Sequence, residues 1–268
     1  MILVKNILKK YGNKKVVNDV SVNIEKGKIT SFIGPNGAGK STLLSMITRL
    51  MNKDFGEVYI EGKEISTWDK KELSKKIAIL KQSNNLNMRL TIRELVSFGR
   101  FPYCEGRLTE EDEKFVDDAI EYMNLVDILE KYLDELSGGQ RQRAFIAMVI
   151  AQGTDYIFLD EPLNNLDMKN ASSMMKVLRN LCDDLGKTII LVMHDINFTA
   201  SYSDYIVALK DGKIAKQGTV DEIINEDTLS SIYEMDFNVQ EIDGNKISIY
   251  YKKKLSISRK EIRIKIKK

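Results

Sequence analysis

The sequence has few of the residues on which disulfide-rich and zinc-dependent proteins rely. Its 268 residues include two cysteines, Cys104 and Cys182, and a single histidine, His194. Two cysteines cannot form a disulfide framework or a metal cluster, and one histidine argues against a histidine-based zinc site. These shortages exclude a small disulfide-stabilised secreted domain and a zinc enzyme. They favour a cytosolic chain with reduced thiols.

Long apolar runs and a leader segment are also missing. No run approaches the ~18–20 apolar residues that a membrane-spanning helix needs. The first residues lack the charged, apolar and small-residue segments of a signal peptide, so we expect none. The formal net charge is +2, so no global charge attracts the chain to nucleic acid or to a membrane. Hydrophobic residues at 43% and charged residues at 30% are typical of a globular protein with a sizeable core.

The charge is concentrated at one end of the sequence. Residues 252–268 carry nine basic side chains and one acidic side chain, a net charge of +8, which leaves −6 on the other residues. This basic tail has two interpretations. It forms a solvated extension or an edge strand protected by lysines, or it contacts the anionic inner leaflet of a membrane. The alternating pattern at 262–266 predicts a strand with one basic face and favours the first interpretation.

Hydrophobic periodicity predicts a mixed α/β fold. Short β-branched runs open the chain and predict antiparallel strands. Later apolar runs, at 29–33, 156–159, 188–193 and 205–209, are separated by segments with helical spacing. Apolar strands that alternate with helices predict a mainly parallel sheet covered on both faces.

Two further features interrupt this pattern. A helical insertion is expected at about residues 85–150, with capping boxes that start at Thr91 and Thr109. A late hairpin is expected at 239–251, around the turn sequence Asp243-Gly244-Asn245.

A glycine-rich segment between the first apolar strand and a helix fits a phosphate-binding loop. It has the pattern G-x-x-x-x-G-K-[ST] and consists of Gly34, Pro35, Asn36, Gly37, Ala38, Gly39, Lys40 and Ser41, followed by Thr42. Glycines allow backbone N–H groups to converge on phosphate oxygens at a helix N-terminus. Lys40 is predicted to reach the β- and γ-phosphates, and the Ser41 hydroxyl to bind Mg²⁺.

The apolar run at 156–159 ends in two carboxylates, Asp160 and Glu161. A parallel strand delivers such groups to the carboxyl edge of the sheet, where ligands of α/β folds collect. We predict that Asp160 holds Mg²⁺, directly or through water, and that Glu161 orients and deprotonates the attacking water. The alternative is a solvated pair at a strand end, which the phosphate loop in the same chain disfavours.

Further motifs follow in a fixed order, and with them the chain resembles the ABC (ATP-binding cassette) ATPases over about residues 1–235. The segment Leu136-Ser137-Gly138-Gly139-Gln140 resembles the family's signature sequence. The other matches are Tyr11 at the adenine-stacking position, Gln82 in the Q-loop, Asn164-Asn165-Leu166-Asp167 in the D-loop and His194 in the H-loop. The D-loop departs from the commoner pattern, because Asn164-Asn165 replaces small residues.

The resemblance implies a P-loop NTPase (RecA-like) core with a parallel sheet, an antiparallel β-subdomain and a helical subdomain. The ABC ATPase domain would span residues 1–240, followed by the hairpin and basic tail at 241–268. Two cassettes would dimerise head to tail around two ATP molecules. The implied nucleotide-binding residues across that dimer are Ser137, Gly138, Gly139, Gln140 and Asp167. Gln82 and His194 would join Glu161 in catalysis, and Gln82 would join Ser41 and Asp160 at the metal.

The stretch from Ser97 to Tyr103 carries a Gly-Arg-x-Pro pattern and resembles the ATPases of iron-siderophore, haem and vitamin B12 importers. The segment 159–167 is similar to that of Gram-positive ferric-siderophore members. The implied protein is a peripheral ATPase at the cytoplasmic face of the cell membrane, with ATP and Mg²⁺ as cofactors. Its implied partners are a second ATPase subunit, either the same chain in a homodimer or a paralogue, permease subunits and an extracellular substrate-binding lipoprotein, with no nucleic acid.

Two other functions stay open on these residues. An ABC exporter ATPase has the same core motifs. A soluble ABC ATPase that acts on nucleic acid or the ribosome usually carries long coiled coils or two cassettes, and neither pattern occurs in this sequence.

Overall fold

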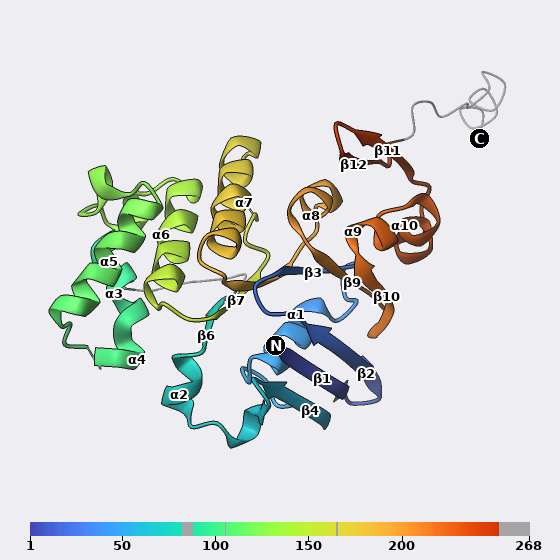
Figure 1. Ribbon diagram of the computed structural model, residues 1–268, viewed down its shortest axis with the longest axis horizontal. Coiled ribbons are helices and arrows are strands. Elements are labelled where there is room, and N and C mark those ends of the chain that lie inside the picture. Colours follow the sequence, from blue (N-terminus) through green and yellow to red (C-terminus); the bar gives the residue numbers. More distant parts are fainter. Residues whose placement is uncertain (82–87, 105, 165, 252–268) are drawn as a thin grey trace, which may run out of the picture.

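The computed structural model describes residues 1–81, 88–104, 106–164 and 166–251 (Figure 1). Gln82, Asn165 and the basic tail at 252–268 therefore lie outside the described residues, and the predictions made for them are not addressed by the structure. Within the described residues, no helix is both long and apolar enough to cross a membrane.

A six-stranded sheet forms the centre of the molecule, in the strand order β10-β9-β3-β8-β7-β6. The five strands from β9 to β6 run parallel, and β10 pairs antiparallel with β9 at one edge. The strands are β3 (Ile29–Ile33), β6 (Ile77–Leu80), β7 (Tyr156–Asp160), β8 (Thr188–Val192), β9 (Tyr205–Lys210) and β10 (Lys213–Thr219). The parallel sheet predicted from the apolar runs is confirmed.

The antiparallel strands predicted at the start of the chain are also confirmed. They form a second sheet in the order β2-β1-β4-β5. Its strands are β1 (Ile2–Tyr11), β2 (Lys14–Ile24), β4 (Phe55–Ile60) and β5 (Lys63–Glu64). A two-stranded hairpin of β11 (Asn238–Ile242) and β12 (Asn245–Ile249) lies near the C-terminal end of the described chain.

In Figure 1 the helices between β6 and β7 lie together at one side of the molecule, and the other helices lie around the sheets. Between β6 and β7 the chain forms α3 (Ile92–Ser97), α4 (Phe101–Cys104), α5 (Glu110–Tyr122) and α6 (Gly138–Ala151). The other helices are α1 (Lys40–Ile47), α2 (Lys70–Ser74), α7 (Met168–Asp183), α8 (Ile196–Tyr202), α9 (Val220–Ile223) and α10 (Glu226–Tyr233). The predicted capping boxes are present at Thr91 and Thr109, where α3 and α5 begin.

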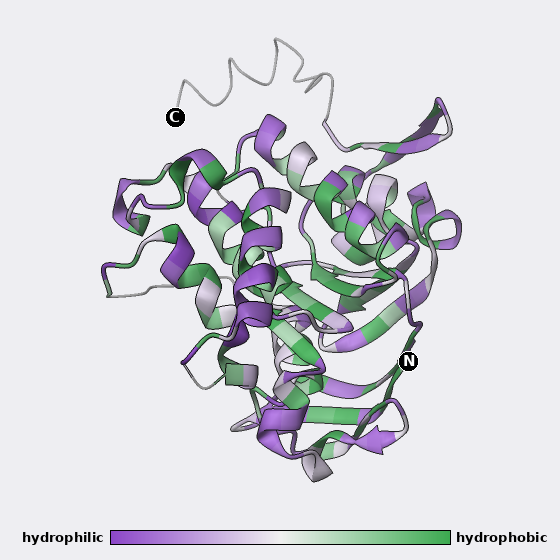
Figure 2. Ribbon diagram, turned by 60° about the vertical axis from the view of Figure 1, so that its left-hand side comes forward, coloured by the Kyte–Doolittle hydropathy of each residue, from purple (hydrophilic) through white to green (hydrophobic). Residues whose placement is uncertain are grey.

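Two hydrophobic cores lie on opposite faces of the parallel sheet. Along β7, Ile157 and Leu159 enter the core shared with α5, α6 and α7, whereas Tyr156 and Phe158 enter the core shared with α1 and the antiparallel sheet. Alternate side chains of a strand point to opposite faces, so a strand buried on both sides must be apolar throughout. Figure 2 shows these apolar strands inside a shell of helices with hydrophilic outer sides.

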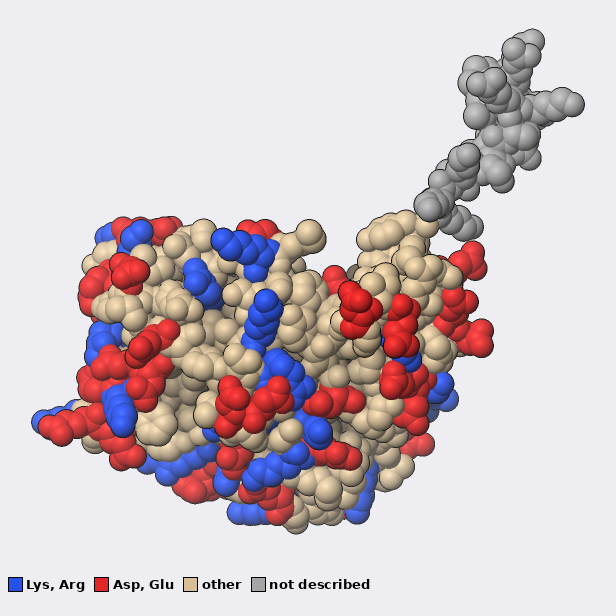
Figure 3. All heavy atoms as spheres, turned by 45° about the horizontal axis from the view of Figure 1, so that its top comes forward, with Lys and Arg blue, Asp and Glu red and all other residues tan. Residues whose placement is uncertain are grey.

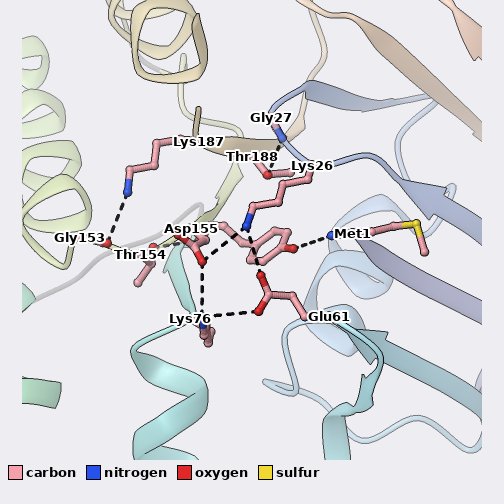
Figure 4. A network of polar contacts seen from close by, with 11 residues as sticks. Met1, Lys26, Gly27, Glu61, Lys76, Gly153, Thr154, Asp155, Lys187 and Thr188 are labelled. Carbon is pink, nitrogen blue, oxygen red and sulfur yellow. Dashed lines mark hydrogen bonds and ion pairs between the residues drawn. The ribbon is translucent and has the colours of Figure 1, made fainter. Parts of the chain in front are cut away.

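The two sheets are joined at the amino ends of β6 and β7 by a polar network (Figure 4). Lys26 and Lys76 each lie between two carboxylates, at 3.4 and 3.5 Å from Glu61 and 4.0 and 3.5 Å from Asp155. Partly exposed ion pairs of this kind each contribute little to stability. The network lies at the opposite end of β7 from Asp160, so it connects the two sheets and does not contact the candidate site.

Figure 3 shows that charged side chains of both signs occur across the face of the molecule drawn there.

Candidate nucleotide-binding site

The phosphate loop joins β3 to α1, and its first and last glycines are required by close backbone contacts. Gly34 has a φ of +138°, and a Cβ added there would lie 2.0 Å from the carbonyl oxygen of Leu209. Gly39 has a φ of +97°, and its added Cβ would lie 2.5 Å from the carbonyl oxygen of Val16. Only glycine combines this left-handed backbone with so close an approach. The two ends of the loop therefore pack directly against the backbones of β9 and β2.

Lys40, the first residue of α1, folds its side chain back over the loop. Its Nζ donates to the carbonyl oxygens of Gly34, at 2.7 Å, and Pro35, at 3.0 Å, and the residue is only 5% exposed. Burial lowers the pKa of Lys40, while the nearby carboxylates of Glu161 and Asp160 act in the opposite direction. The structure thus places a buried amino group within the loop, beside two acids.

Ser41 and Asp160 meet where the first turn of α1 faces the end of β7. The Ser41 hydroxyl donates to Oδ1 of Asp160 at 2.8 Å. Burial raises the pKa of Asp160, and the hydrogen bond from Ser41 opposes that shift. Two neighbouring oxygen ligands, one of them an acid, fit a hard divalent cation such as Mg²⁺.

Glu161 follows the last residue of β7 and has a left-handed backbone conformation. It is a non-glycine residue with a φ of +54°, and its N–H donates to the carbonyl oxygen of Val192 at 3.2 Å. Its Oε1 lies 2.6 Å from Nε2 of His194, which follows the neighbouring strand β8. The two adjacent acids therefore have different partners, Ser41 for Asp160 and His194 for Glu161.

Of these groups, Lys40, Ser41, Glu161 and His194 line one pocket of about 160 Å³. It is lined by Val16, Asn36, Gly37, Ala38, Gly39, Lys40, Ser41, Thr42, Glu161 and His194. A second pocket, of about 450 Å³, follows the other side of the loop and includes Lys14, Lys15, Lys210 and Tyr233. The fold thus brings three motifs, separate in the sequence, to one place. The convergence of a buried lysine with a lowered pKa and polar groups from three motifs indicates a functional site.

Tyr11 lies apart from both pockets. It ends β1, is 53% exposed, and its hydroxyl donates to Sδ of Met51 at 3.2 Å. The stacking role expected for it stays a prediction.

The signature residues also lie apart from the phosphate loop of their own chain. Ser137 caps α6, where its hydroxyl accepts from the N–H of Gln140 at 3.3 Å, and Oε1 of Gln140 accepts from the N–H of Ser137 at 3.0 Å. Gly139 packs against Asn170 of α7, so that an added Cβ would lie 3.0 Å from its amide nitrogen. None of the signature residues lines either of the two pockets.

Asp167 has a similar capping position in the D-loop. It caps α7, and its carboxylate accepts from the N–H of Asn170 at 2.7 Å and from the side-chain amide at 2.9 Å. Asn164 donates to Oε2 of Glu161 at 3.4 Å, so the unusual D-loop residue contacts the acid predicted to act as a base.

Two residues of this region were not found by sequence reasoning. Val16 supplies the carbonyl that faces Gly39, and Tyr233 accepts a hydrogen bond from the N–H of Gly34 at 3.1 Å. Neither contact has a local sequence signal, because both depend on how distant strands and helices pack.

Known proteins resemble this chain over most of its length. The family model described as "ABC transporter" matches residues 17–164. The petrobactin import ATP-binding protein YclP of Bacillus subtilis is 62% identical over 251 residues, which cover 94% of this chain and 100% of that protein. The iron(3+)-hydroxamate import ATP-binding protein FhuC of the same organism is 42% identical and covers 85% of this chain and 86% of its own. A dimeric structure of the cassette MJ0796 matches with a TM-score of 0.74 and 34% identity, over 82% of this chain and 99% of that one. The predicted ABC-type fold is thereby confirmed, and this chain belongs to the ABC transporter family.

Proposed function

We propose that this chain is the ATP-binding and ATP-hydrolysing subunit of an ABC importer that powers uptake of a ferric siderophore through a separate membrane permease. The observation that carries the ATPase proposal is the single pocket shared by the phosphate loop, Glu161 and His194. The printed functions of YclP and FhuC, petrobactin import and iron(3+)-hydroxamate import, support the choice of cargo class.

The site geometry supports a distinct role for each group. Lys40 and the loop amides bind the phosphates, since they supply positive charge and N–H donors at a helix N-terminus. Ser41 and Asp160 would hold Mg²⁺, which would supply positive charge to neutralise the phosphates. Gln82, which lies outside the described residues, is proposed as a third ligand, and phosphate and water would complete the coordination of the ion.

Glu161 is proposed as the general base. Its carboxylate takes a proton from the attacking water, and the Nε2 of His194, 2.6 Å from Oε1, keeps that carboxylate oriented. His194 is also proposed to contact the γ-phosphate. Gln82 is proposed to couple metal and water to the permease, and Tyr11 to stack on adenine.

The signature supports a composite site in a homodimer. Ser137 and the amides after it form the N-terminus of α6, a 14-residue helix whose positive end suits an anion. Because these residues lie outside the pocket of their own chain, we propose that they bind the γ-phosphate held by Lys40 of a second copy. Asp167 is proposed to belong to the same composite nucleotide site.

Exchange of Ser137 for arginine tests the composite site. Ser137→Arg places a bulky cation at the helix end, so it is expected to preserve ATP binding by the monomer, to block the ATP-dependent dimer and to lower turnover about 10²-fold or more. Gel filtration with ATP and Mg²⁺ and a nucleotide titration measure both effects. Ser173→Arg, on the exposed side of α7, is the matched control. An ATP dimer of normal affinity in Ser137→Arg would contradict the composite site.

Deletion of the gene tests the cargo. The strain is expected to lose growth on one ferric siderophore as the iron source and to recover when iron salts are supplied in excess. Affinity capture from solubilised membranes is expected to yield a permease. Normal growth on every siderophore would favour an exporter, and capture of ribosomes or nucleic acid would favour a soluble ABC ATPase.

We also propose the remaining features of such a system. The chain would lie at the cytoplasmic face of the membrane as a peripheral subunit, and a substrate-binding lipoprotein would deliver the cargo outside. The ATPase domain would span about residues 1–240, with a helical subdomain at about 85–150, followed by the hairpin and basic tail at 241–268. The proposed boundary at residue 240 lies within β11 (Asn238–Ile242).

A further inference from the structure

The phosphate loop has one partner from the far end of the chain. The N–H of Gly34, the first glycine of the loop, donates to the hydroxyl of Tyr233 at 3.1 Å, across 199 positions of sequence. Tyr233 is the last residue of α10, a helix that lies beside β9 (Figure 1). The residue lines the 450 Å³ pocket together with Asn36, Gly37 and Ala38 of the loop.

Gly34 connects Tyr233 to Lys40 through the two hydrogen-bonding groups of its backbone. Its N–H is bound by Tyr233, and its carbonyl oxygen accepts from Nζ of Lys40 at 2.7 Å. The contact between Gly34 and the Leu209 carbonyl leaves no room for a side chain. A rotation of the peptide before Gly34 would therefore disturb the orientation of the glycine and, with it, the carbonyl that holds Lys40.

The hydroxyl of Tyr233 is well placed to act as a fixed acceptor. Its ring packs 5.8 Å from the ring of Phe237, which is 8% exposed and in turn lies 5.7 Å from the ring of Tyr250. Burial raises the pKa of Tyr233 to about 12, although the hydrogen bond from Gly34 acts in the opposite direction. The side chain is thus both neutral and restrained by neighbours from the C-terminal hairpin region.

We propose that Tyr233 is a positioning residue for the phosphates of ATP, whose hydroxyl fixes the Gly34 amide and so keeps the phosphate loop and Lys40 in their binding geometry. This inference rests on the proposed ATPase function. It gives α10 a role in nucleotide affinity that no motif of the sequence indicates. It does not require Tyr233 to touch the nucleotide.

Tyr233→Phe tests the proposal because it removes the hydroxyl and keeps the ring in its stack. A neutral hydrogen bond typically contributes ~1 kcal/mol, so the Kd of ATP and of ADP and the KM for ATP are expected to rise about 3- to 10-fold. The kcat is expected to stay within about 2-fold, since Glu161 and His194 are untouched. Nucleotide titration, steady-state kinetics and thermal melting measure these quantities.

The matched control is Tyr122→Phe. The Tyr122 hydroxyl is buried without a hydrogen-bond partner among the described residues, so the same change there is expected to leave the Kd of ATP unchanged. Because the Tyr233 hydroxyl titrates only near pH 12, the ratio of mutant to wild-type KM is expected to be constant between about pH 6 and pH 9.

The possible outcomes separate this inference from the proposed function. Wild-type protein that binds no ATP would overturn the proposed function itself. Wild-type protein that binds ATP, with an equal Kd in Tyr233→Phe, would overturn only the role of Tyr233. A lower kcat at unchanged KM, or loss of the folded state, would make Tyr233 a structural residue and would also overturn the inference.

Discussion

Glu161→Gln is expected to lower ATP turnover about 10²- to 10⁴-fold, the usual contribution of a positioned general base, while ATP binding is retained. Glutamine keeps the shape of the side chain but cannot accept a proton from water. The groups proposed to bind phosphate and metal are unchanged, because Asp160 has a different partner, Ser41. Without hydrolysis the ATP-bound dimer is expected to persist. A phosphate-release assay and gel filtration with ATP and Mg²⁺ measure the two effects.

Two results would contradict this assignment in different ways. Hydrolysis at the wild-type rate would remove Glu161 from catalysis, and loss of ATP binding would place Glu161 among the nucleotide or metal ligands. Glu57→Gln, an identical change at an exposed position of β4, is the control and is expected to leave both activities unchanged.

Arg100→Ala is expected to lower the free energy of unfolding by about 3–5 kcal/mol, the usual effect of removing one partner of a buried ion pair. Arg100 and Asp112 are each 4% exposed, and Nε of Arg100 donates to Oδ1 of Asp112 at 2.9 Å. The guanidinium also donates to the carbonyl of Ala151 and stacks between the rings of Tyr103 and Phe115, at 3.9 and 4.1 Å. Its removal leaves a buried carboxylate without its cation. Urea denaturation at neutral pH measures the loss.

Arg93→Ala is the control for Arg100→Ala. Arg93 also pairs with acids of α5, Glu113 and Asp117, but these groups are at least one-third exposed, so Arg93→Ala is expected to cost less than ~1 kcal/mol. Equal losses in the two variants would contradict the special role of the buried pair.

The pH dependence follows from Asp112. Burial alone raises its pKa, but hydrogen bonds from Thr109 and Arg100 outweigh burial and hold the pKa below its ordinary value. Because the folded-state pKa is the lower one, the stabilisation is complete above about pH 4 and is lost as the pH falls through the lowered pKa. The difference between wild type and Arg100→Ala is therefore expected to shrink below about pH 4.

Arg100 belongs to a sequence pattern whose structural role differs from the function that the pattern indicated. The Gly-Arg-x-Pro stretch indicated an importer subgroup through resemblance alone. In the structure, Gly99 packs against the Met148 carbonyl of α6, where an added Cβ would lie 2.2 Å away. Arg100 donates both to Asp112 of α5 and to the carbonyl of Ala151 at the end of α6. The stretch therefore joins the helices between β6 and β7 into one unit, a role that only the packing shows.

What the sequence determined by itself is local in the chain. The glycine spacing and Lys40 predict a phosphate loop because the loop binds through its own backbone, and apolar strands predict a sheet buried on both faces because side chains alternate. The two adjacent acids at the end of β7, Asp160 and Glu161, predict a site at the carboxyl edge of that sheet. In the structure, Lys40, Ser41, Asp160, Glu161 and His194 do lie around one region of that edge.

What only the tertiary structure decided depends on groups that are distant in sequence. The pairing of Glu161 with His194, the Val16 carbonyl under Gly39 and the Tyr233 hydroxyl on Gly34 each join segments whose separation carries no periodic signal. Their physical basis is long-range packing, because a backbone carbonyl or a tyrosine at a helix end acquires a role only when another element is brought against it. Ser137 lies outside the phosphate-loop pocket of its own chain for the same reason. The packing of α6 in the hydrophobic core determines the position of the helix N-terminus that Ser137 caps.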